Sequence, residues 1–324
     1  MLNGTSNYNI LIVDDDEAHR NLESEILSLQ NHTVTEAENA ERALELVKSN
    51  DFDAVLLDKR MPGIDGDTFC HKVRNELGLS LLPLIMVTGT NNRDELLKSL
   101  NAGATDFICK PFHPSELVAR VNSAAKLKRV TDQLDDMESM LFSLARMIEA
   151  KDEHTGNQCY RLSQLSGKFG SSLGLSNKDI TALEKGGVLH DIGKLGIPDA
   201  VLMKPSALNE EELAVMSKHP VIGHNMCAGL KSMKHTAPII LHHHERWDGS
   251  GYPYGLKGDD IPYLAQVFQL VDIFDALTYE RPYKAAFSID KALSILKKET
   301  EKGWRNPVLV DKFIDFIRAQ DNLE

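Results

Sequence analysis

The first third of the chain alternates short apolar runs with amphipathic stretches. The runs typical of buried strands are Asn9–Val13, Thr33–Glu36, Ala54–Leu57, Leu84–Thr88 and Asp106–Ile108. The stretches with helical periodicity are Ala18–Leu29, Ala40–Val47, Thr68–Glu76 and Arg93–Asn101. Regular alternation of this kind is typical of a doubly wound α/β sheet. We therefore expect an α/β domain over residues 1–126.

A heptad pattern follows the last predicted strand. Apolar residues recur at alternating spacings of three and four, at Leu127, Val130, Leu134, Met137, Leu141, Leu144 and Ile148. Such a seam is typical of a coiled coil, and it also suits one amphipathic helix that packs on its own domain. Because the stretch joins two domains and is otherwise charged, the pattern favours a helical linker over residues 127–148 that forms a homodimer.

The rest of the chain, residues 149–324, has a helical pattern without strand signals. It is interrupted by loops rich in glycine and proline at Gly193–Pro198, Gly249–Pro253 and Gly255–Pro262. Helical patterns separated by such breakers predict an all-α domain.

Composition narrows the function classes. A length of 324 residues, 42% hydrophobic and 26% charged, suits a soluble protein of two domains. A net charge of −12 weighs against DNA as a partner, although a small anionic ligand remains possible. The apolar runs are too short for a membrane span, the polar N-terminus does not resemble a signal peptide, and the scattered cysteines suit a reduced, cytoplasmic protein.

Polar residues gather where the predicted strands end. They are Asp14 and Asp15, Asp58, Thr88 and Lys110. Ligands of doubly wound sheets bind at the carboxyl ends of the strands. Clustered carboxylates need a hard cation such as Mg²⁺, beside which Asp58 can attack a phosphoryl donor while Lys110 and Thr88 contact the phosphoryl oxygens.

These residues resemble the receiver domain of response regulators, the CheY-like family. The matching motifs are VDD at 13–15, DKRMPG at 58–63, Thr88, and KPF at 110–112. The resemblance implies a flavodoxin-like fold, a bound Mg²⁺, and phosphorylation of Asp58 by a cognate sensor histidine kinase. It also implies that Thr88 and Phe107 occupy the switch positions.

Histidine and aspartate pairs mark the second domain. The candidate metal ligands are His190 and Asp191, His219, His243 and His244, and Asp272. Imidazole and carboxylate ligands favour iron or manganese over magnesium, and the lack of nearby thiolates weighs against structural zinc. Consecutive ligands suit the end of a helix, where the chain turns. Two metal ions sharing a carboxylate would suit a phosphohydrolase.

The same residues resemble the HD-GYP family of phosphodiesterases. The matching motifs are HDIGK at 190–194, HHERWDGSGYP at 243–253 and DIFDALTYERPYK at 272–284. The resemblance implies an all-helical HD domain that hydrolyses cyclic di-GMP. It assigns the six residues above as ligands, with Asp191 bridging two ions.

The resemblance also implies contacts to the substrate. Lys194 would steady the scissile phosphate, and Arg281 and Lys284 would contact the other phosphate or a guanine. Tyr252 either contacts the substrate or holds the Gly-Pro loop. His242 precedes the family's pair, and we expect it to be a bystander.

One position departs from the family pattern. Gln158 stands where the family usually has a histidine, and His154 stands where members with three metals have a glutamate. We therefore expect two divalent ions and release mainly of linear pGpG. The alternatives are a phosphodiesterase for cyclic GMP-AMP and a weakly active scaffold that binds the dinucleotide.

Overall fold

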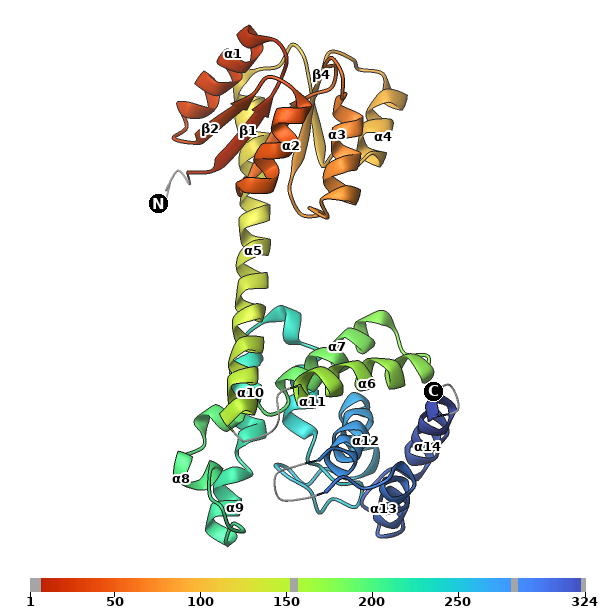
Figure 1. Cartoon of the computed structure of the whole chain (residues 1–324). Helices are drawn as coiled ribbons and strands as arrows, with labels where there is room; N and C mark the ends of the chain where they lie inside the picture. Colours follow the sequence, from red (N-terminus) through yellow and green to blue (C-terminus); the bar gives the residue numbers. More distant parts are fainter. Residues whose placement is uncertain (1–6, 152–156, 281–284, 322–324) are drawn as a thin grey trace. The chain divides into compact units, whose positions relative to one another are not determined.

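The computed structural model describes residues 7–151, 157–280 and 285–321. The chain divides into two compact units, the first unit Met1–Asp136 and the second unit Met137–Glu324. The division falls inside helix α5 (Pro114–Lys151), within the stretch where the heptad pattern predicts a helix (Figure 1).

The first unit contains one parallel sheet of five strands in the order β2-β1-β3-β4-β5. The strands are β1 (Asn9–Val13), β2 (Thr33–Ala37), β3 (Ala54–Asp58), β4 (Leu84–Thr88) and β5 (Asp106–Cys109). This is the strand order of flavodoxin-like folds. The predicted fold class is confirmed, and each strand lies within one residue of its predicted range.

Helices cover both faces of this sheet. They are α1 (Glu17–Ser28), α2 (Ala40–Ser49), α3 (Gly66–His71), α4 (Arg93–Asn101) and the beginning of α5. Successive side chains of a strand point to opposite faces. Accordingly Leu11 and Val13 pack with residues of α2 and α3, whereas Ile10 and Ile12 pack with residues of α1 and α5. The predicted helix Thr68–Glu76 starts two residues earlier, and its second half is a π-helical turn, η1 (Lys72–Glu76).

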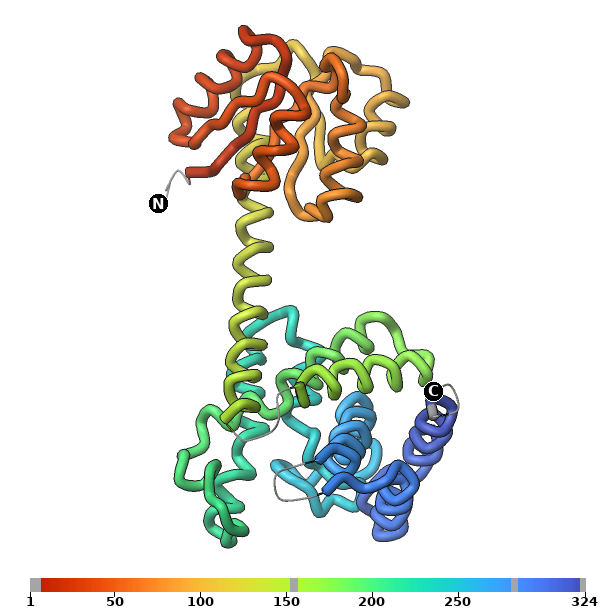
Figure 2. Tube along the Cα trace, viewed as in Figure 1, coloured from red at the N-terminus to blue at the C-terminus, as the bar shows by residue number. Residues whose placement is uncertain are grey.

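The second unit is helical, and the predicted all-α class is confirmed. Its elements are α6 (Gln158–Ser172), α7 (Asn177–Leu189), η2 (Ile192–Gly196), α8 (Asp199–Leu202), α9 (Glu210–Met216), α10 (His219–Cys227), η3 (Lys231–Met233), α11 (Ala237–His242), η4 (Gly258–Asp260), α12 (Tyr263–Thr278), α13 (Ile289–Glu301) and α14 (Pro307–Asp321). Helices α6 and α7 run side by side, and α12 packs against both (Figure 2).

The end of α5 belongs to the core of the second unit. Ala145 packs in a buried cluster with Leu189 and Ile240, and Leu141 and Leu144 pack against that cluster. The alternative of a helix packed on its own domain is therefore correct for the C-terminal half of the heptad seam.

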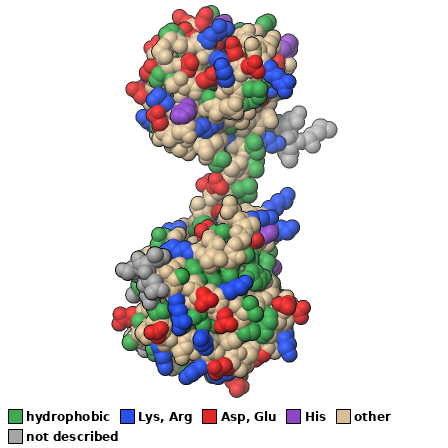
Figure 3. Space-filling model, turned by 90° about the vertical axis from the view of Figure 1, so that its right-hand side faces the viewer, with side chains coloured by type: hydrophobic (Ala, Val, Ile, Leu, Met, Phe, Trp, Pro, Cys, Tyr) green, Lys and Arg blue, Asp and Glu red, His purple; other side chains and the backbone are tan. Residues whose placement is uncertain are grey.

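The N-terminal half of the seam lies on the surface. Leu127, Val130, Leu134 and Met137 expose 66%, 46%, 44% and 47% of their area. Hydrophobic side chains are visible on this part of α5 in Figure 3, and positive and negative side chains are interspersed on the face of each unit that the figure shows. Among the described residues, no helix is long and apolar enough to cross a bilayer.

Candidate metal centre and phosphoacceptor site

The polar residues predicted at the strand ends of the first unit include a group in direct contact. Lys110 Nζ donates hydrogen bonds of 2.8 Å to Asp14 Oδ2 and of 2.8 Å to Asp58 Oδ1. Thr88 is buried at the end of β4, and its hydroxyl accepts the Thr90 N–H. Asp15 lies next to Asp14 with an exposed side chain, and Phe107 in β5 is partly buried.

The charges of this pocket suit a phosphoryl group and a hard cation. Burial alone would lower the pKa of Lys110, but its hydrogen bonds to Asp14 and Asp58 raise that pKa, so the ammonium stays charged. Sequence reasoning missed His19, whose Nδ1 lies 3.1 Å from Lys110 Nζ and 3.5 Å from Asp14 Oδ2. Its place in the first turn of α1, just after the strand-end acids, was the available signal.

The histidine and aspartate residues of the second unit converge from four helices. His190 is the C-terminal cap of α7 and Asp191 follows it, while His243 is the C-terminal cap of α11 and His244 follows it. His219 opens α10, and Asp272 lies in α12. The expectation that each pair of consecutive candidate ligands stands at a helix end is confirmed.

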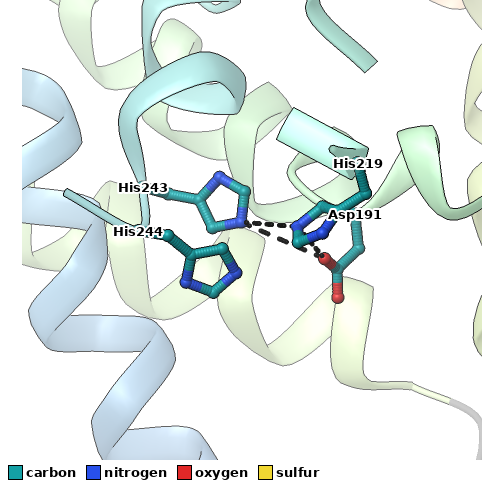
Figure 4. A group of neighbouring side chains, drawn as sticks. All are labelled: Asp191, His219, His243 and His244. Carbon is teal, nitrogen blue, oxygen red and sulfur yellow. Dashed lines mark hydrogen bonds and ion pairs between the residues drawn. The ribbon is translucent and has the colours of Figure 1, made fainter. Parts of the chain in front are cut away.

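Four of these residues form one compact group. Asp191, His219, His243 and His244 offer ligand atoms that all lie within 4.8 Å of one another (Figure 4). His219 Nε2 lies 3.2 Å from Asp191 Oδ1 and 3.4 Å from His243 Nε2. The other carboxylate oxygen, Asp191 Oδ2, lies 3.3 Å from His190 Nε2, which is 3.9 Å from Asp272 Oδ1.

The arrangement of Asp191 is that of a central carboxylate. Its Oδ1 faces His219 and His243, and its Oδ2 faces His190, so its two oxygens point toward two different sets of candidate ligands. A carboxylate between two ligand sets is suited to join two cations.

Main-chain carbonyls orient two of the imidazoles. His219 Nδ1 lies 2.8 Å from the Met216 carbonyl, and His243 Nδ1 lies 2.8 Å from the Ile240 carbonyl. A carbonyl only accepts, so each Nδ1 carries a proton, and the neutral form of each ring presents the lone pair of Nε2 to the cluster. Two lone pairs 3.4 Å apart beside a carboxylate fit a cation between them.

Electrostatics keeps Asp191, His243 and His244 in their ligating forms. Burial and the neighbouring histidines lower the pKa of His243 well below its ordinary value and that of His244 to about 3. Burial would raise the pKa of Asp191, but Lys194 and His190 hold it well below its usual range. At the other set of donors, burial would lower the pKa of His190 but Asp191 and Asp272 raise it, and burial raises the pKa of Asp272, so a cation bound there would displace protons. The grouping of imidazoles and carboxylates therefore fits divalent metal ions, with Asp191, His243 and His244 already in the forms that bind them.

Lys194 lies at the edge of this cluster. Its Nζ is 3.0 Å from Asp191 Oδ2, in the 3-10 turn η2 that follows the His-Asp pair. Gly193 allows this turn to approach α10, because a Cβ there would lie 1.9 Å from the His219 carbonyl oxygen. The glycine of the HDIGK motif thus brings Asp191 and Lys194 against the helix that begins with His219.

The Gly-Tyr-Pro loop is held against the second histidine pair. The Tyr252 ring lies 4.7 Å from the His244 ring, between ring centres, and the Tyr252 N–H donates to the His244 carbonyl. A Cβ at Gly251 would lie 2.2 Å from the main-chain nitrogen of Arg246, so the close approach of the loop requires glycine.

Sequence reasoning missed two residues that support this loop. Glu245 is fully buried, and its carboxylate accepts the N–H groups of Tyr254 at 2.8 Å and Leu256 at 3.0 Å. Gln269 in α12 donates to the carbonyls of His242 and Glu245. The acid directly after the histidine pair was a signal for the first, whereas Gln269 had none in the sequence.

The structure describes two of the remaining candidates, Gln158 and His242. Gln158 is the first residue of α6 and lines a small cavity of about 20 Å³ with His190, Asp191 and Lys194. His242 Nδ1 lies 3.8 Å from Glu245 and outside the group of four. His154, Arg281 and Lys284 lie outside the described residues.

Comparisons with known proteins agree with this division of the chain. The response regulator receiver domain matches residues 10–122, and the HD domain matches residues 143–308. The chain is 36% identical over 311 residues to the cyclic di-GMP phosphodiesterase response regulator RpfG of Xanthomonas campestris pv. campestris, covering 89% of this chain and 82% of that protein.

Two further relatives bear on the substrate. A cyclic di-GMP phosphodiesterase of Thermotoga maritima is 32% identical over 333 residues, covering 94% of this chain and 89% of its own length. The 3′3′-cGAMP-specific phosphodiesterase 3 of Vibrio cholerae is 36% identical over 167 residues, covering 51% of this chain and 36% of its own length.

Proposed function

We propose that this chain, which belongs to the family of response regulators with a receiver domain followed by an HD domain, is a metal-dependent phosphodiesterase for cyclic di-GMP. The observation that carries the proposal is the position of Asp191 between two sets of imidazole and carboxylate donors. The relatives that share both domains over most of their length are cyclic di-GMP phosphodiesterases, which supports the same substrate.

The side chains around the cluster have distinct tasks in this proposal. His219, His243 and His244 would hold one ion with Asp191, and His190 and Asp272 would hold a second. Divalent iron or manganese bound there would polarise a phosphoryl oxygen and acidify a water molecule. The ammonium of Lys194 would offset negative charge that develops on the scissile phosphate. Tyr252, whose ring packs against the ring of His244, would border the substrate on the side of the His243-His244 pair.

The receiver would control this activity through phosphorylation. A cognate sensor histidine kinase would transfer a phosphoryl group to Asp58 with Mg²⁺ held by Asp14, Asp15 and Asp58. The contacts of Lys110 with Asp14 and Asp58 support this assignment, because the same ammonium would pair with the added phosphoryl oxygens. Thr88 is buried at the end of β4, next to the strand that ends with Asp58, and its hydroxyl would form a hydrogen bond with the phosphoryl group.

The product is proposed to be linear pGpG. Opening the ring requires charge stabilisation at one phosphate, whereas the second cleavage acts on a substrate with an additional terminal phosphate. Gln158 offers a neutral amide in place of a histidine, and the cavity it shares with Asp191 and Lys194 has room for about one water molecule. Of the described residues, the one at this position therefore offers only a weak ligand to a third cation that could offset the added charge.

The decisive experiment uses the full chain purified anaerobically and loaded with iron or manganese. Cyclic di-GMP and 3′3′-cyclic GMP-AMP are supplied in parallel, and pGpG, GMP and the linear mixed dinucleotide are separated by chromatography. We expect faster turnover of cyclic di-GMP. A preference for cyclic GMP-AMP would agree with the Vibrio cholerae relative, and binding without turnover of either would establish the scaffold instead.

A substitution at Gln158 tests the proposed product and metal count. Wild type should contain about two ions per chain in the second unit and release mainly pGpG. Gln158→His should raise the metal content and the GMP yield together, because an imidazole is a stronger ligand than an amide. About three ions per chain in the wild type, or rapid conversion of pGpG to GMP, would contradict the proposal.

A further inference from the structure

Glu149 joins the end of α5 to the beginning of α6. Its side chain is only 9% exposed, its Oε1 accepts the N–H groups of Asn157 at 3.0 Å and of Gln158, and its Oε2 accepts that of Cys159 at 3.2 Å. The first N–H groups of a helix lack partners within the helix and attract negative charge. Asn157, the residue before α6, provides no side-chain cap. The cap of α6 therefore comes from another helix.

The charge of Glu149 is maintained despite its burial. Burial alone would raise its pKa, but hydrogen bonds from Cys159 and from the N–H groups of α6 hold the pKa below its ordinary value. The interaction is thus a buried carboxylate at a helix N-terminus, one of the stronger kinds of hydrogen bond in a protein.

The beginning of α6 lies beside the metal cluster. Gln158 and Glu149 line the same small cavity as His190, Asp191 and Lys194. One turn further along α6, Arg161 donates two hydrogen bonds, of 2.8 and 3.0 Å, to the carboxylate of Asp275. Asp275 lies in α12 one turn after Asp272, a candidate ligand. A contiguous set of contacts thus runs from Glu149 through α6 to the candidate ligands.

We propose that Glu149 is a positioning residue through which α5 sets the place of α6, and with it Gln158 and Asp272, at the metal centre. This inference rests on the proposed function. Helix α5 also contributes Leu117 and Val121 to the core of the first unit and Ala145 to that of the second. A displacement of its last turn therefore acts on the metal centre at Glu149.

Glu149→Gln and Glu149→Ala, in the full metal-loaded chain, test this role. The matched control is Glu138→Gln, because Glu138 on the same helix pairs with Lys185 of α7 at 2.6 Å and does not line the metal-side cavity. Loss of partners that orient ligands typically costs about 10–100-fold in metal affinity or activity. We expect Glu149→Ala to lower kcat and metal affinity by about that factor with KM little changed, Glu149→Gln to be intermediate, and Glu138→Gln to match wild type.

The outcomes separate positioning from general stability. Phosphorylation should change the activity of Glu138→Gln as it does that of wild type, and should change that of Glu149→Gln much less. If Glu149→Ala does not fold, Glu149→Gln decides. The proposal would be overturned if Glu149→Gln kept the kcat, the metal affinity and the phosphorylation response of wild type. It would also be overturned if Glu138→Gln lost as much kcat and metal affinity as the Glu149 variants. Metal affinity remains informative even if wild type hydrolyses no cyclic dinucleotide, so the two proposals can fail separately.

Discussion

At the scale of single residues, the second unit gathers four imidazoles around the carboxylate of Asp191. Main-chain carbonyls of Met216 and Ile240 fix the tautomers of His219 and His243, and burial keeps His243 and His244 unprotonated. Such side chains are ready to bind a cation without first losing a proton. Their mutual proximity, with Asp191 among them, is therefore an arrangement that metal binding would stabilise.

Asp191→Ala should abolish hydrolysis and remove bound metal, because the same carboxylate faces both ligand sets. Lys194→Ala is the matched comparison. It should retain the metal ions but lose about 10²–10³-fold in kcat, the typical cost of removing one charge-stabilising group. Metal analysis, turnover and circular dichroism of both variants check this. Wild-type turnover by metal-loaded Asp191→Ala would refute the assignment of the site.

Glu23 predicts a pH dependence of the first unit. Burial, with smaller contributions from Asp14 and Asp58 against Lys110, raises its pKa from 4.5 to about 8. Between these pH values the folded state binds more protons than the unfolded state, so the stability contribution is present at low pH and is lost as pH rises toward about 8. Glu23→Gln stays neutral and should remove this loss.

Thermal unfolding at two pH values measures the effect. One unit of pKa shift corresponds to about 1.4 kcal/mol, which is at least about 4 °C in Tm for a domain of this size. Glu23→Gln should unfold at a higher temperature than wild type near pH 8.5 and close to wild type near pH 4.5. Glu25→Gln, exposed on the same helix, is the control. A constant difference between wild type and Glu23→Gln at both pH values would show that Glu23 does not titrate as described.

At the scale of elements, periodicity and strand-end chemistry predicted most of the first unit. Most of its strands are short apolar runs bounded by polar residues, so the local pattern located them within one residue. The motifs of the second unit did not indicate how their residues are arranged in space. Pattern predicted that the His-Asp and His-His pairs end helices, but the contacts of Glu149 with α6 and of Glu245 with the Gly-Tyr-Pro loop depend on packing between elements. Such tertiary contacts leave no period in the sequence.

Helix α5 shows the same limit within one element. A heptad continues from Leu127 to Ile148, yet Leu141, Leu144 and Ile148 are used inside the second unit, whereas Leu127 and Leu134 are exposed. A sequence period indicates an apolar face but not which partner covers it. Substituting Leu141 would therefore disturb folding as well as any dimer.

The homodimer that the heptad pattern predicts can be tested on the exposed half of the seam. Leu127→Glu with Leu134→Glu should convert a dimer into monomers at about micromolar concentration, since charges at seam positions cannot be buried. Ser139→Glu, exposed on the opposite side of the heptad, should keep the wild-type state. Sedimentation of the three proteins, with and without phosphorylation, gives the result. Identical sedimentation of wild type and the double variant would make the exposed seam a surface feature only.

At the scale of the whole molecule, each unit carries its own core and its own cluster of charged groups. The first unit has buried hydrophobic clusters on the two faces of its sheet. The second unit has a main hydrophobic cluster around α12 and a smaller one at the end of α5. Because α5 takes part in cores of both units, a change in the packing of either one has a physical route to the other. Phosphorylation would act at one end of this route, since it adds negative charge among Asp14, Asp58 and Lys110.

Phosphorylation of Asp58 should therefore change the activity of the second unit. The incoming phosphoryl group would compete with Asp14 for Lys110, whose Nζ now lies 2.8 Å from the carboxylates of Asp14 and Asp58. This change would alter how β4 and β5 pack against the beginning of α5. Treatment with a small phosphoryl donor should label wild type and not Asp58→Ala, and should alter kcat or the oligomeric state of wild type alone. Labelling of Asp58→Ala to the same extent would place the phosphoryl group elsewhere. Labelled wild type with unchanged turnover and unchanged sedimentation would mean that α5 does not carry the signal.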